Sequence, residues 1–310
     1  MFEGNILLID MDKTKIGNVA LMKISAHYKK LGYLTHLNDI DVRPDKVFIS
    51  TIFKKNRAKV DQWLNIYPDA EVGGTGWDLQ TNLADEIEYI KPDYELYPNI
   101  HHGIGFTSRG CIRKCSFCVV AEKEGKMRSV ATVHDIYNPK SDKIILLDNN
   151  FFANPDWKDR VEEIVQLKLK VDFNGGIDMR IMTDEIAQGI VYANPPYTRF
   201  AFDDIKLEKT VKKGIETLRR NGFPINRNRL GAFVLVGYNS THEEDLYRVN
   251  MLHDYNINTH VQCFEGSPRL TRHLNNWANS PRQWRHHSFD DYNAVAKLRN
   301  KDNEQKELTL

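Results

Sequence analysis

The sequence is organised around one stretch, Phe106-Thr107-Ser108-Arg109-Gly110-Cys111-Ile112-Arg113-Lys114-Cys115-Ser116-Phe117-Cys118. It holds three of the chain's four cysteines, spaced C-x-x-x-C-x-x-C: Cys111, Cys115 and Cys118. An apolar run precedes them and Gly110 permits a tight turn, so we expect the cysteines on a loop just after a strand. Three thiolates this close can hold three corners of an iron–sulfur cube, although such clusters usually take four cysteines. The fourth, Cys263, lies far away in sequence, and without it one iron would stay open to another ligand.

A zinc site is the other metal reading of the same residues. It would use the three cysteines with His101, His102 or Cys263 as the fourth ligand. Zinc sites more often use two separated pairs of ligands, so the spacing favours the iron–sulfur cluster.

The stretch resembles the signature of the radical S-adenosylmethionine (SAM) superfamily, C-x-x-x-C-x-aromatic-C, with Phe117 at the aromatic position. The resemblance implies a 4Fe-4S cluster whose open iron is chelated by the amino and carboxylate groups of SAM, with Phe117 beside the adenine. It implies reductive cleavage of SAM to methionine and a 5′-deoxyadenosyl radical, which abstracts hydrogen from a substrate. Such an enzyme needs a low-potential electron donor, a flavodoxin or ferredoxin. The sequence identifies neither the substrate nor a catalytic acid or base.

Composition is that of an ordinary globular protein, with 310 residues, 41% hydrophobic and 27% charged. The net charge of +1 gives no strong field that would favour nucleic acid or membrane. Three cysteines in one loop do not resemble a disulfide framework. The beginning of the chain has no basic segment, and its apolar run at residues 6–9 is too short for a signal peptide or membrane span. We therefore expect a cytoplasmic enzyme.

Residues 1–90 alternate between strand and helix patterns, which predicts a small doubly wound, Rossmann-like α/β domain. Strands are expected at 5–10, 46–50 and 70–72, and helices at 19–31 and 60–66. Residues 91–102, with Pro92 and Pro98, are predicted to be a linker.

This first domain resembles the cobalamin-binding domain that precedes many radical SAM cores. The marks that carry the resemblance are Asp12, Thr14 and Gly17 in place of D-x-H-x-x-G, Ser50 in place of S-x-L, and the pair Gly73 and Gly74. Thr14 replaces the histidine, so no lower axial ligand is expected. The intervals between these marks along the chain are also shorter than is usual in that family. The resemblance implies the fold more strongly than bound cobalamin. The same residues are also ordinary loop residues of an open α/β sheet. A cobalamin-dependent radical SAM methyltransferase is the alternative enzyme.

The alternation continues from residue 103 and predicts a partial (β/α)6 TIM-like barrel over residues 103–265. Strands are expected at 103–107, 143–147, 171–174, 199–202, 232–236 and 260–264, and helices at 156–169, from 183, at 208–220 and at 243–255. A closed eight-fold barrel usually needs about 250 residues. Functional residues are expected at the carboxyl ends of the strands.

Polar residues follow the second strand at Asp148-Asn149-Asn150. In the radical SAM family this strand end binds the amino group of SAM, and a D-D-N-F version occurs in cobalamin-linked members. This sequence departs from it at Asn149, whose neutral amide can still accept a hydrogen bond from an ammonium group. The alternative is a turn with a helix cap.

Further candidates follow the later strands. Arg180 can clamp the SAM carboxylate or form a surface ion pair, and Asp178 or Asn174 can reach ribose hydroxyls. Asp203 and Asp204 can bind substrate or start a helix. Gly237 would make room for adenine, whereas Thr241 with Glu244 indicates a capping box. Cys263 is either a buried hydrophobe or a thiol that contacts substrate.

The C-terminal extension, residues 266–310, interleaves basic and aromatic residues: Arg269, Arg272, His273, Trp277, Arg282, Trp284, Arg285, His286 and His287. Such a pattern can bind nucleic acid, and it keeps open a non-catalytic nucleic-acid-binding protein with a structural metal loop. We favour a helix that closes the barrel's open edge with its tryptophans packed inward. The polar tail, residues 301–310, is expected to be disordered.

Overall fold

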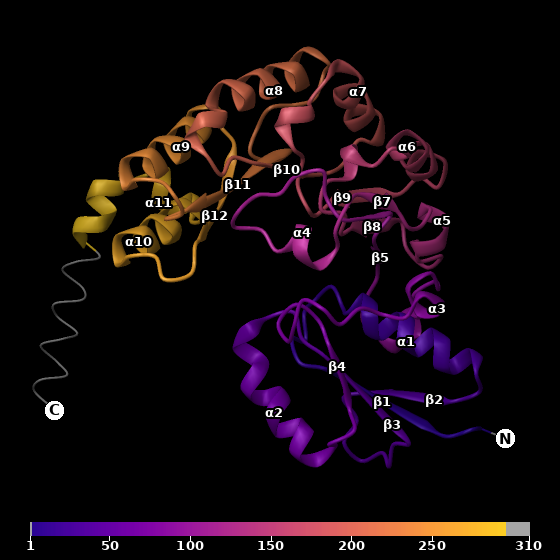
Figure 1. The fold of residues 1–310 in the computed structure, drawn as a ribbon. Coiled ribbons are helices and arrows are strands. Elements are labelled where there is room, and N and C mark those ends of the chain that lie inside the picture. The colour runs from indigo at the N-terminus through magenta and orange to yellow at the C-terminus, as the bar shows by residue number, and fades with distance from the viewer. Residues whose placement is uncertain (1, 296–310) are drawn as a thin grey trace, which may run out of the picture. The chain divides into compact units, whose positions relative to one another are not determined.

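The structure is a computed structural model that describes residues 2–295 of the chain. The described residues divide into two compact units, one up to Asp172 and one from Phe173. Parallel strands joined by helices build both units, so the α/β class predicted from the sequence is confirmed (Figure 1). The expected disordered tail at residues 301–310 lies outside the described residues.

The first unit begins with a four-stranded parallel sheet in the order β2-β1-β3-β4. Its elements are β1 (Asn5–Asp10), α1 (Val19–Lys30), β2 (Leu34–Leu37), β3 (Lys46–Ser50), α2 (Arg57–Ile66), β4 (Glu71–Gly73) and the short α3 (Asp85–Glu88). Along β1 the side chains alternate: Ile6 and Leu8 pack in one apolar cluster with α1, and Leu7 and Ile9 pack in another with Val60 of α2. Helices therefore cover both faces, which is the doubly wound arrangement.

The predicted linker packs within the first unit. Leu96 is buried in the α1 cluster, and the hydroxyl of Tyr94 donates to the carbonyl oxygen of Ile136. The segment therefore joins the first sheet to the elements that follow it, and the unit extends past residues 91–102 to Asp172.

A second sheet has the order β5-β8-β9, with β5 and β8 parallel. The elements from there on are β5 (Gly103–Gly105), β6 (Ser108–Arg109), α4 (Val120–Lys123), β7 (Arg128–Ser129), α5 (Val133–Ile136), β8 (Lys143–Leu146), α6 (Trp157–Gln166) and β9 (Lys170–Phe173). The three cysteines lie between β6 and β7, which pair antiparallel. The loop predicted to follow the strand at residue 103 is therefore present, with a short ladder at its base.

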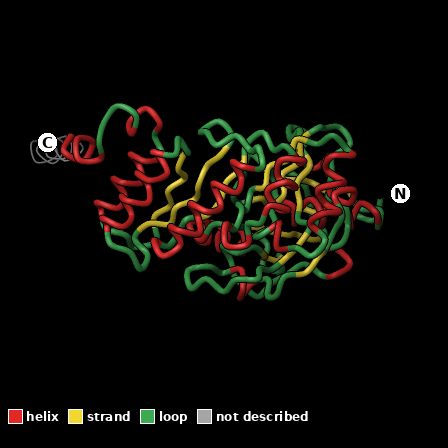
Figure 2. The backbone as a smooth tube through the Cα atoms, turned by 90° about the horizontal axis from the view of Figure 1, so that it is seen from above, coloured by secondary structure: helices red, strands yellow, loops and turns green. Residues whose placement is uncertain are grey.

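The second unit contains the parallel sheet β10-β11-β12. Its elements are α7 (Asp184–Ala193), β10 (Thr198–Ala201), α8 (Glu208–Arg220), β11 (Leu230–Val236), α9 (His242–Asp254), β12 (Asn258–Cys263), α10 (Arg269–Ala278) and α11 (Pro281–Trp284). Figure 2 shows the alternation of red helices and yellow strands. Thr183 caps α7, and Thr241 with Glu244 forms the predicted capping box of α9. The closure of a partial barrel stays a prediction.

Candidate functional site

The cysteine loop is closed at its base by backbone contacts. Ser108 and Arg109 pair with Ser129 and Arg128, and the N–H of Cys111 donates to the carbonyl oxygen of Gly125 over 3.4 Å. Gly110 has φ +79°, and a Cβ there would lie 2.3 Å from the carbonyl oxygen of Lys126. A side chain at this position would separate the two ends of the loop, so the closure requires glycine.

Asp148 holds the entry to the loop. Its carboxylate accepts hydrogen bonds from the backbone N–H and the hydroxyl of Thr107, at 3.1 and 2.6 Å, and from those of Ser108, both at 2.6 Å. The side chain is buried, which raises the pKa of Asp148, while the four donors act in the opposite direction. The sequence predicted that Asp148 faces SAM. In the structure its carboxylate binds Thr107 and Ser108, which lead into the cysteine loop.

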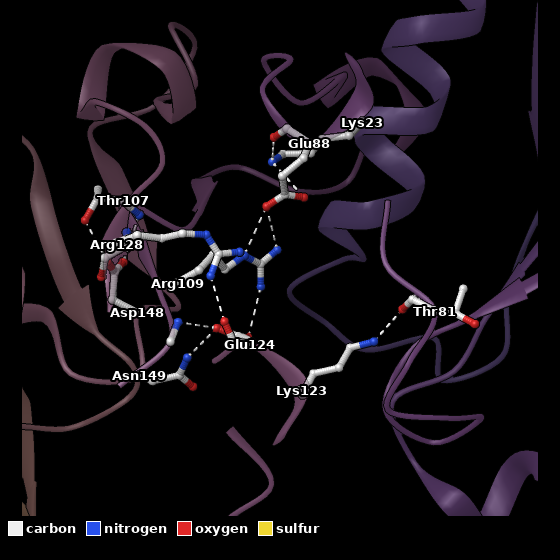
Figure 3. Close-up of polar contacts among 12 residues, drawn as sticks. Lys23, Thr81, Glu88, Thr107, Arg109, Lys123, Glu124, Arg128, Asp148 and Asn149 are labelled. Carbon is white, nitrogen blue, oxygen red and sulfur yellow. Dashed lines mark hydrogen bonds and ion pairs between the residues drawn. The ribbon is translucent and has the colours of Figure 1, made fainter. Parts of the chain in front are cut away.

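Glu124 ties the loop to the end of β8. Its Oε2 accepts from the N–H of Gly110 and from Nδ2 of Asn149, both at 2.8 Å, and its Oε1 accepts from Arg109 at 3.2 Å (Figure 3). The Arg109 guanidinium lies 3.5 Å from the centre of the Phe106 ring. The carboxylate of Glu124 therefore contacts Gly110, Asn149 and Arg109 at once.

The same arginine reaches the N-terminal sheet domain. Arg109 forms an ion pair with Glu88 at 3.0 Å, and Glu88 lies 3.6 Å from the amine of Lys23 on α1. Burial lowers the pKa of Lys23, and the Glu88 carboxylate opposes that shift. Lys123 also donates to the carbonyl oxygen of Thr81. Figure 3 shows this row of charges, with Arg109 between Glu88 and Glu124.

The cysteines are accessible, since Cys118 is exposed and Cys111 and Cys115 are half-buried. The N–H of Arg113 donates to Sγ of Cys111 at 3.4 Å, and Nδ2 of Asn150 lies 4.0 Å from the same sulfur. Among residues 2–295, no group of three or more His, Cys, Asp or Glu side chains is arranged to hold a metal ion. By donor type alone, three thiols with N–H groups near the sulfur of Cys111 suit an iron–sulfur cluster.

The histidines of the zinc reading lie just before β5. His101 is exposed, and the ring of half-buried His102 lies 3.3 Å from the carbonyl oxygen of Ile16. Burial lowers the pKa of His102. The contact with Ile16 does not bring His102 to the cysteines.

The residues of the first unit that were predicted to bind SAM differ in their exposure and in their hydrogen bonds. Phe117 is half-buried and Asn150 is buried. Asn149 donates its Nδ2 to Glu124, and Figure 3 shows its amide oxygen pointing away from that carboxylate. An amide oxygen can accept from an ammonium group, and the contact of Asn149 with the amino group of SAM stays a prediction.

The SAM residues predicted in the second unit follow β9. Asn174 is exposed, and Asp178 caps a short 3-10 helix (Met179–Ile181). Nε of Arg180 donates to Asp178 at 2.6 Å. Arg180 is thus in the ion pair that the sequence offered as its alternative role, and its contact with a SAM carboxylate stays a prediction.

Gly237 has a packing reason to be glycine. Its φ is +74°, and a Cβ would lie 2.4 Å from Oγ of Ser267. Its N–H donates to Asp245 at 2.8 Å. The side of Gly237 where a Cβ would stand is therefore taken by Ser267, and the adenine contact also stays a prediction.

Sequence reasoning missed the buried ion pair of Asp245 and Arg248, 2.6 Å apart on α9. Arg248 is fully buried and also donates to the carbonyl oxygens of Phe202, at 2.5 Å, and Leu235, at 2.8 Å. The spacing i, i+3 on a helix was the available signal. Glu124 was missed too, because nothing in its local sequence indicates that it returns to the cysteine loop.

The aspartates after β10 have separate roles. Asp203 is half-buried and accepts from the N–H of Leu235 at 2.9 Å, and burial raises its pKa. Asp204 caps a short 3-10 helix through the N–H of Lys206. Asp204 is therefore an ordinary helix start, as its sequence position allows.

The residues that resemble cobalamin-binding loops meet at the carboxyl edge of the first sheet. Asp12 accepts from the hydroxyl of Thr51 at 3.1 Å, the N–H of Ile52 at 2.5 Å and the amide of Asn56 at 2.8 Å. Ser50 accepts from Asn18 at 2.9 Å. The polar groups of these marks are thus engaged with other residues of the same edge.

The glycines and Thr14 complete this edge. A Cβ on Gly74, whose φ is +98°, would lie 2.2 Å from the carbonyl oxygen of Thr51, and one on Gly17 would lie 2.6 Å from Ile100. Gly73 accepts from the N–H of Thr51 at 3.0 Å. The hydroxyl of Thr14 donates to the carbonyl oxygen of Gly17 and supplies no imidazole. These loops supply no axial ligand for cobalamin, and we derive no step through it.

The C-terminal aromatic residues pack inward, as expected. Trp277 is 3% exposed, and its indole N–H donates to the carbonyl oxygen of His287 at 3.0 Å. Trp284 stacks on His253 with ring centres 3.9 Å apart. Burial lowers the pKa of His253 to about 4. Nearby, half-buried Cys263 donates to the carbonyl oxygen of Thr271 over 3.5 Å, and burial raises the pKa of its thiol.

Neither a protein-family model nor a curated protein sequence matches the chain. Among solved structures, the chain is similar to the apo, selenomethionine-labelled cobalamin-dependent S-adenosylmethionine radical enzyme OxsB. The two share 13% sequence identity with a TM-score of 0.42, over 84% of this chain and 49% of that one. This chain thus spans about half the length of OxsB. No helix within residues 2–295 is long and apolar enough to cross a bilayer.

Proposed function

We propose that the chain is a radical SAM enzyme, with a 4Fe-4S cluster on Cys111, Cys115 and Cys118. The observation that carries the proposal is the cysteine loop itself. Its three thiols reach the surface, its base is fixed by Gly110, Asp148 and Glu124, and N–H donors are directed at the sulfur of Cys111. A cluster requires thiolates held at set positions with donors that tune its potential.

Each remaining residue then has a role in binding. Asn149 accepts a hydrogen bond from the SAM ammonium, Phe117 lies beside the adenine, and Asp148 positions the strand end through Thr107 and Ser108. In a partial barrel, Asn174, Asp178, Arg180 and Gly237 would complete the SAM site. When bound, the cluster and SAM supply a one-electron reductive cleavage that ends in hydrogen abstraction from the substrate. The electron comes from a low-potential flavodoxin or ferredoxin.

The test is anaerobic reconstitution with iron and sulfide, followed by dithionite and SAM without substrate. We expect release of 5′-deoxyadenosine, measured by chromatography, and its loss in Cys115→Ala. Cys263→Ala is the matched control, since this thiol contacts the carbonyl oxygen of Thr271 and no cluster role is assigned to it. Retained iron and cleavage in Cys115→Ala, or zinc in place of iron in the wild type, would remove the proposal.

A further inference from the structure

The one mismatch between this chain and the D-D-N-F strand end is Asn149, and the structure places a carboxylate beside it. Oε2 of Glu124 lies 2.8 Å from Nδ2 of Asn149. An aspartate at position 149 would put two carboxylates in contact, and neighbouring carboxylates disfavour each other's charged forms. We propose that Glu124 is the positioning residue that makes asparagine necessary here and aims its amide oxygen at the amino group of SAM. This inference rests on the proposed function.

The orientation follows from the hydrogen-bonding capacity of the two groups. An ionised carboxylate only accepts, whereas an asparagine amide donates through nitrogen and accepts through oxygen. Glu124 therefore selects one of the two orientations of the Asn149 amide, and its oxygen points away from Glu124 (Figure 3). Without the carboxylate, both orientations would become available. The acceptor for an ammonium group would then be present only part of the time.

Glu124 also relates this amide to the cluster loop. The oxygen that accepts from Asn149 accepts from the N–H of Gly110 as well, at 2.8 Å, and Gly110 directly precedes Cys111. One atom thus fixes the distance between the loop and the strand end. SAM bridges those two places in the proposed reaction, since one part of it binds iron and its ammonium meets Asn149.

Glu124 belongs to a row of paired charges. Arg109 lies between Glu124 at 3.2 Å and Glu88 at 3.0 Å, and its side chain is only 19% exposed. Lys23 supplies a second positive charge next to Glu88. Two cations and two carboxylates alternate in the row. The N-terminal domain therefore holds Glu124 in place through Arg109.

Exchanging the two groups tests the pairing. Asn149→Asp is expected to weaken SAM binding by about tenfold or more, because two carboxylates are then in contact. Glu124→Gln is expected to weaken it by about twofold, because the Asn149 oxygen then faces SAM only part of the time. In the double variant the new glutamine amide donates to the new aspartate, and the N–H of Gly110 loses the acceptor that Glu124 offers it. We expect the double variant to bind SAM about threefold or more tighter than Asn149→Asp alone, because the contact between two carboxylates is gone. Binding is measured on the reconstituted cluster by the change in its electron paramagnetic resonance signal.

The control is Glu122→Gln, an exposed carboxylate on the short helix α4 that ends just before Glu124, and it should leave affinity unchanged. Single variants whose effects simply add in the double variant would overturn the proposal. So would singles that bind SAM as the wild type does.

A second measurement does not depend on SAM. Amide hydrogen exchange at Gly110 in the cluster-free protein should accelerate about tenfold or more in Glu124→Ala and stay unchanged in Glu122→Ala. If exchange responds in this way but the wild type binds no SAM, the proposed function fails while the positioning of the loop by Glu124 stands. Unchanged exchange in Glu124→Ala would overturn the positioning role itself.

Discussion

The cysteine loop and the C-terminal aromatic layer (α9, α10 and α11) are both dense in chemically distinctive side chains, and they use them in opposite ways. In the loop, buried groups such as Asp148 support side chains that stay accessible, including exposed Cys118. In the aromatic layer, Trp277 is buried and the ring of Trp284 stacks on that of His253, so these side chains pack against other residues of the layer.

The difference shows that residue type alone does not make a site. A functional group must stay accessible while its neighbours fix its position. The carboxyl edge of the first sheet makes the same point. Asp12, Ser50 and Gly74 match a binding-loop pattern, yet each is engaged by adjoining residues of that edge.

Closing the base of the loop should have the largest effect on stability. In Gly110→Ala, the new Cβ stands 2.3 Å from a carbonyl oxygen at φ +79°. We expect a loss of about 3 kcal/mol in the free energy of unfolding, from the left-handed backbone and the overlap together. Urea denaturation followed by circular dichroism measures it.

Gly125→Ala is the matched control at the other end of the same loop. Its φ is +73°, but a Cβ would meet no heavy atom within 4 Å. Only the cost of the left-handed backbone remains, so we expect a loss of about 1 kcal/mol in the free energy of unfolding. Equal losses in the two variants would mean that the loop is not closed as the structure has it.

Much of the fold was predictable because periodicity carries it. The strands at residues 5–10 and 46–50 and the helix at residues 208–220 have their predicted bounds, since each is a clear apolar run or an amphipathic pattern. The helix starts at Thr183 and Thr241 were predictable because capping is local chemistry.

The rest depended on contacts between distant residues. The β6 and β7 strands have two residues each, too few to show any alternation. Glu124 meets Asn149 across 25 positions and Arg109 meets Glu88 across 21. The cysteines of the candidate site were readable from spacing, whereas the residues that position them were not.

In the aromatic layer, the buried histidine should make stability depend on pH. His253 has a pKa of about 4 in the folded chain, against 6.5 ordinarily. Between these values the unfolded chain binds the proton and the folded chain does not, so stability is complete above about pH 6.5 and falls as pH decreases toward 4. From about pH 7.5 to about pH 5 the expected loss is about 2 kcal/mol.

His253→Phe isolates this contribution, because phenylalanine can still stack on Trp284 and does not titrate. Urea denaturation at the two pH values should lose about 2 kcal/mol less in the variant than in the wild type. Identical pH dependence in the two proteins would show that His253 is reached by water, and the packed reading of this layer would fail with it.

The smallest expected effect concerns nucleic acid. Stacking of a base on an accessible indole contributes about 1–3 kcal/mol, so a stacking site at Trp284 would lose that much on Trp284→Leu. Because the ring already lies on His253, we expect the affinity for a single-stranded oligonucleotide, measured by fluorescence anisotropy, to stay unchanged.

Arg269 and Arg272 are exposed, so any binding should instead weaken with added salt and with Arg272→Gln. A loss of 1 kcal/mol or more in folded Trp284→Leu would mean that the aromatic layer opens to bases. The aromatic layer would then differ from the cysteine loop only in its closed conformation, and its rings would not be permanently packed.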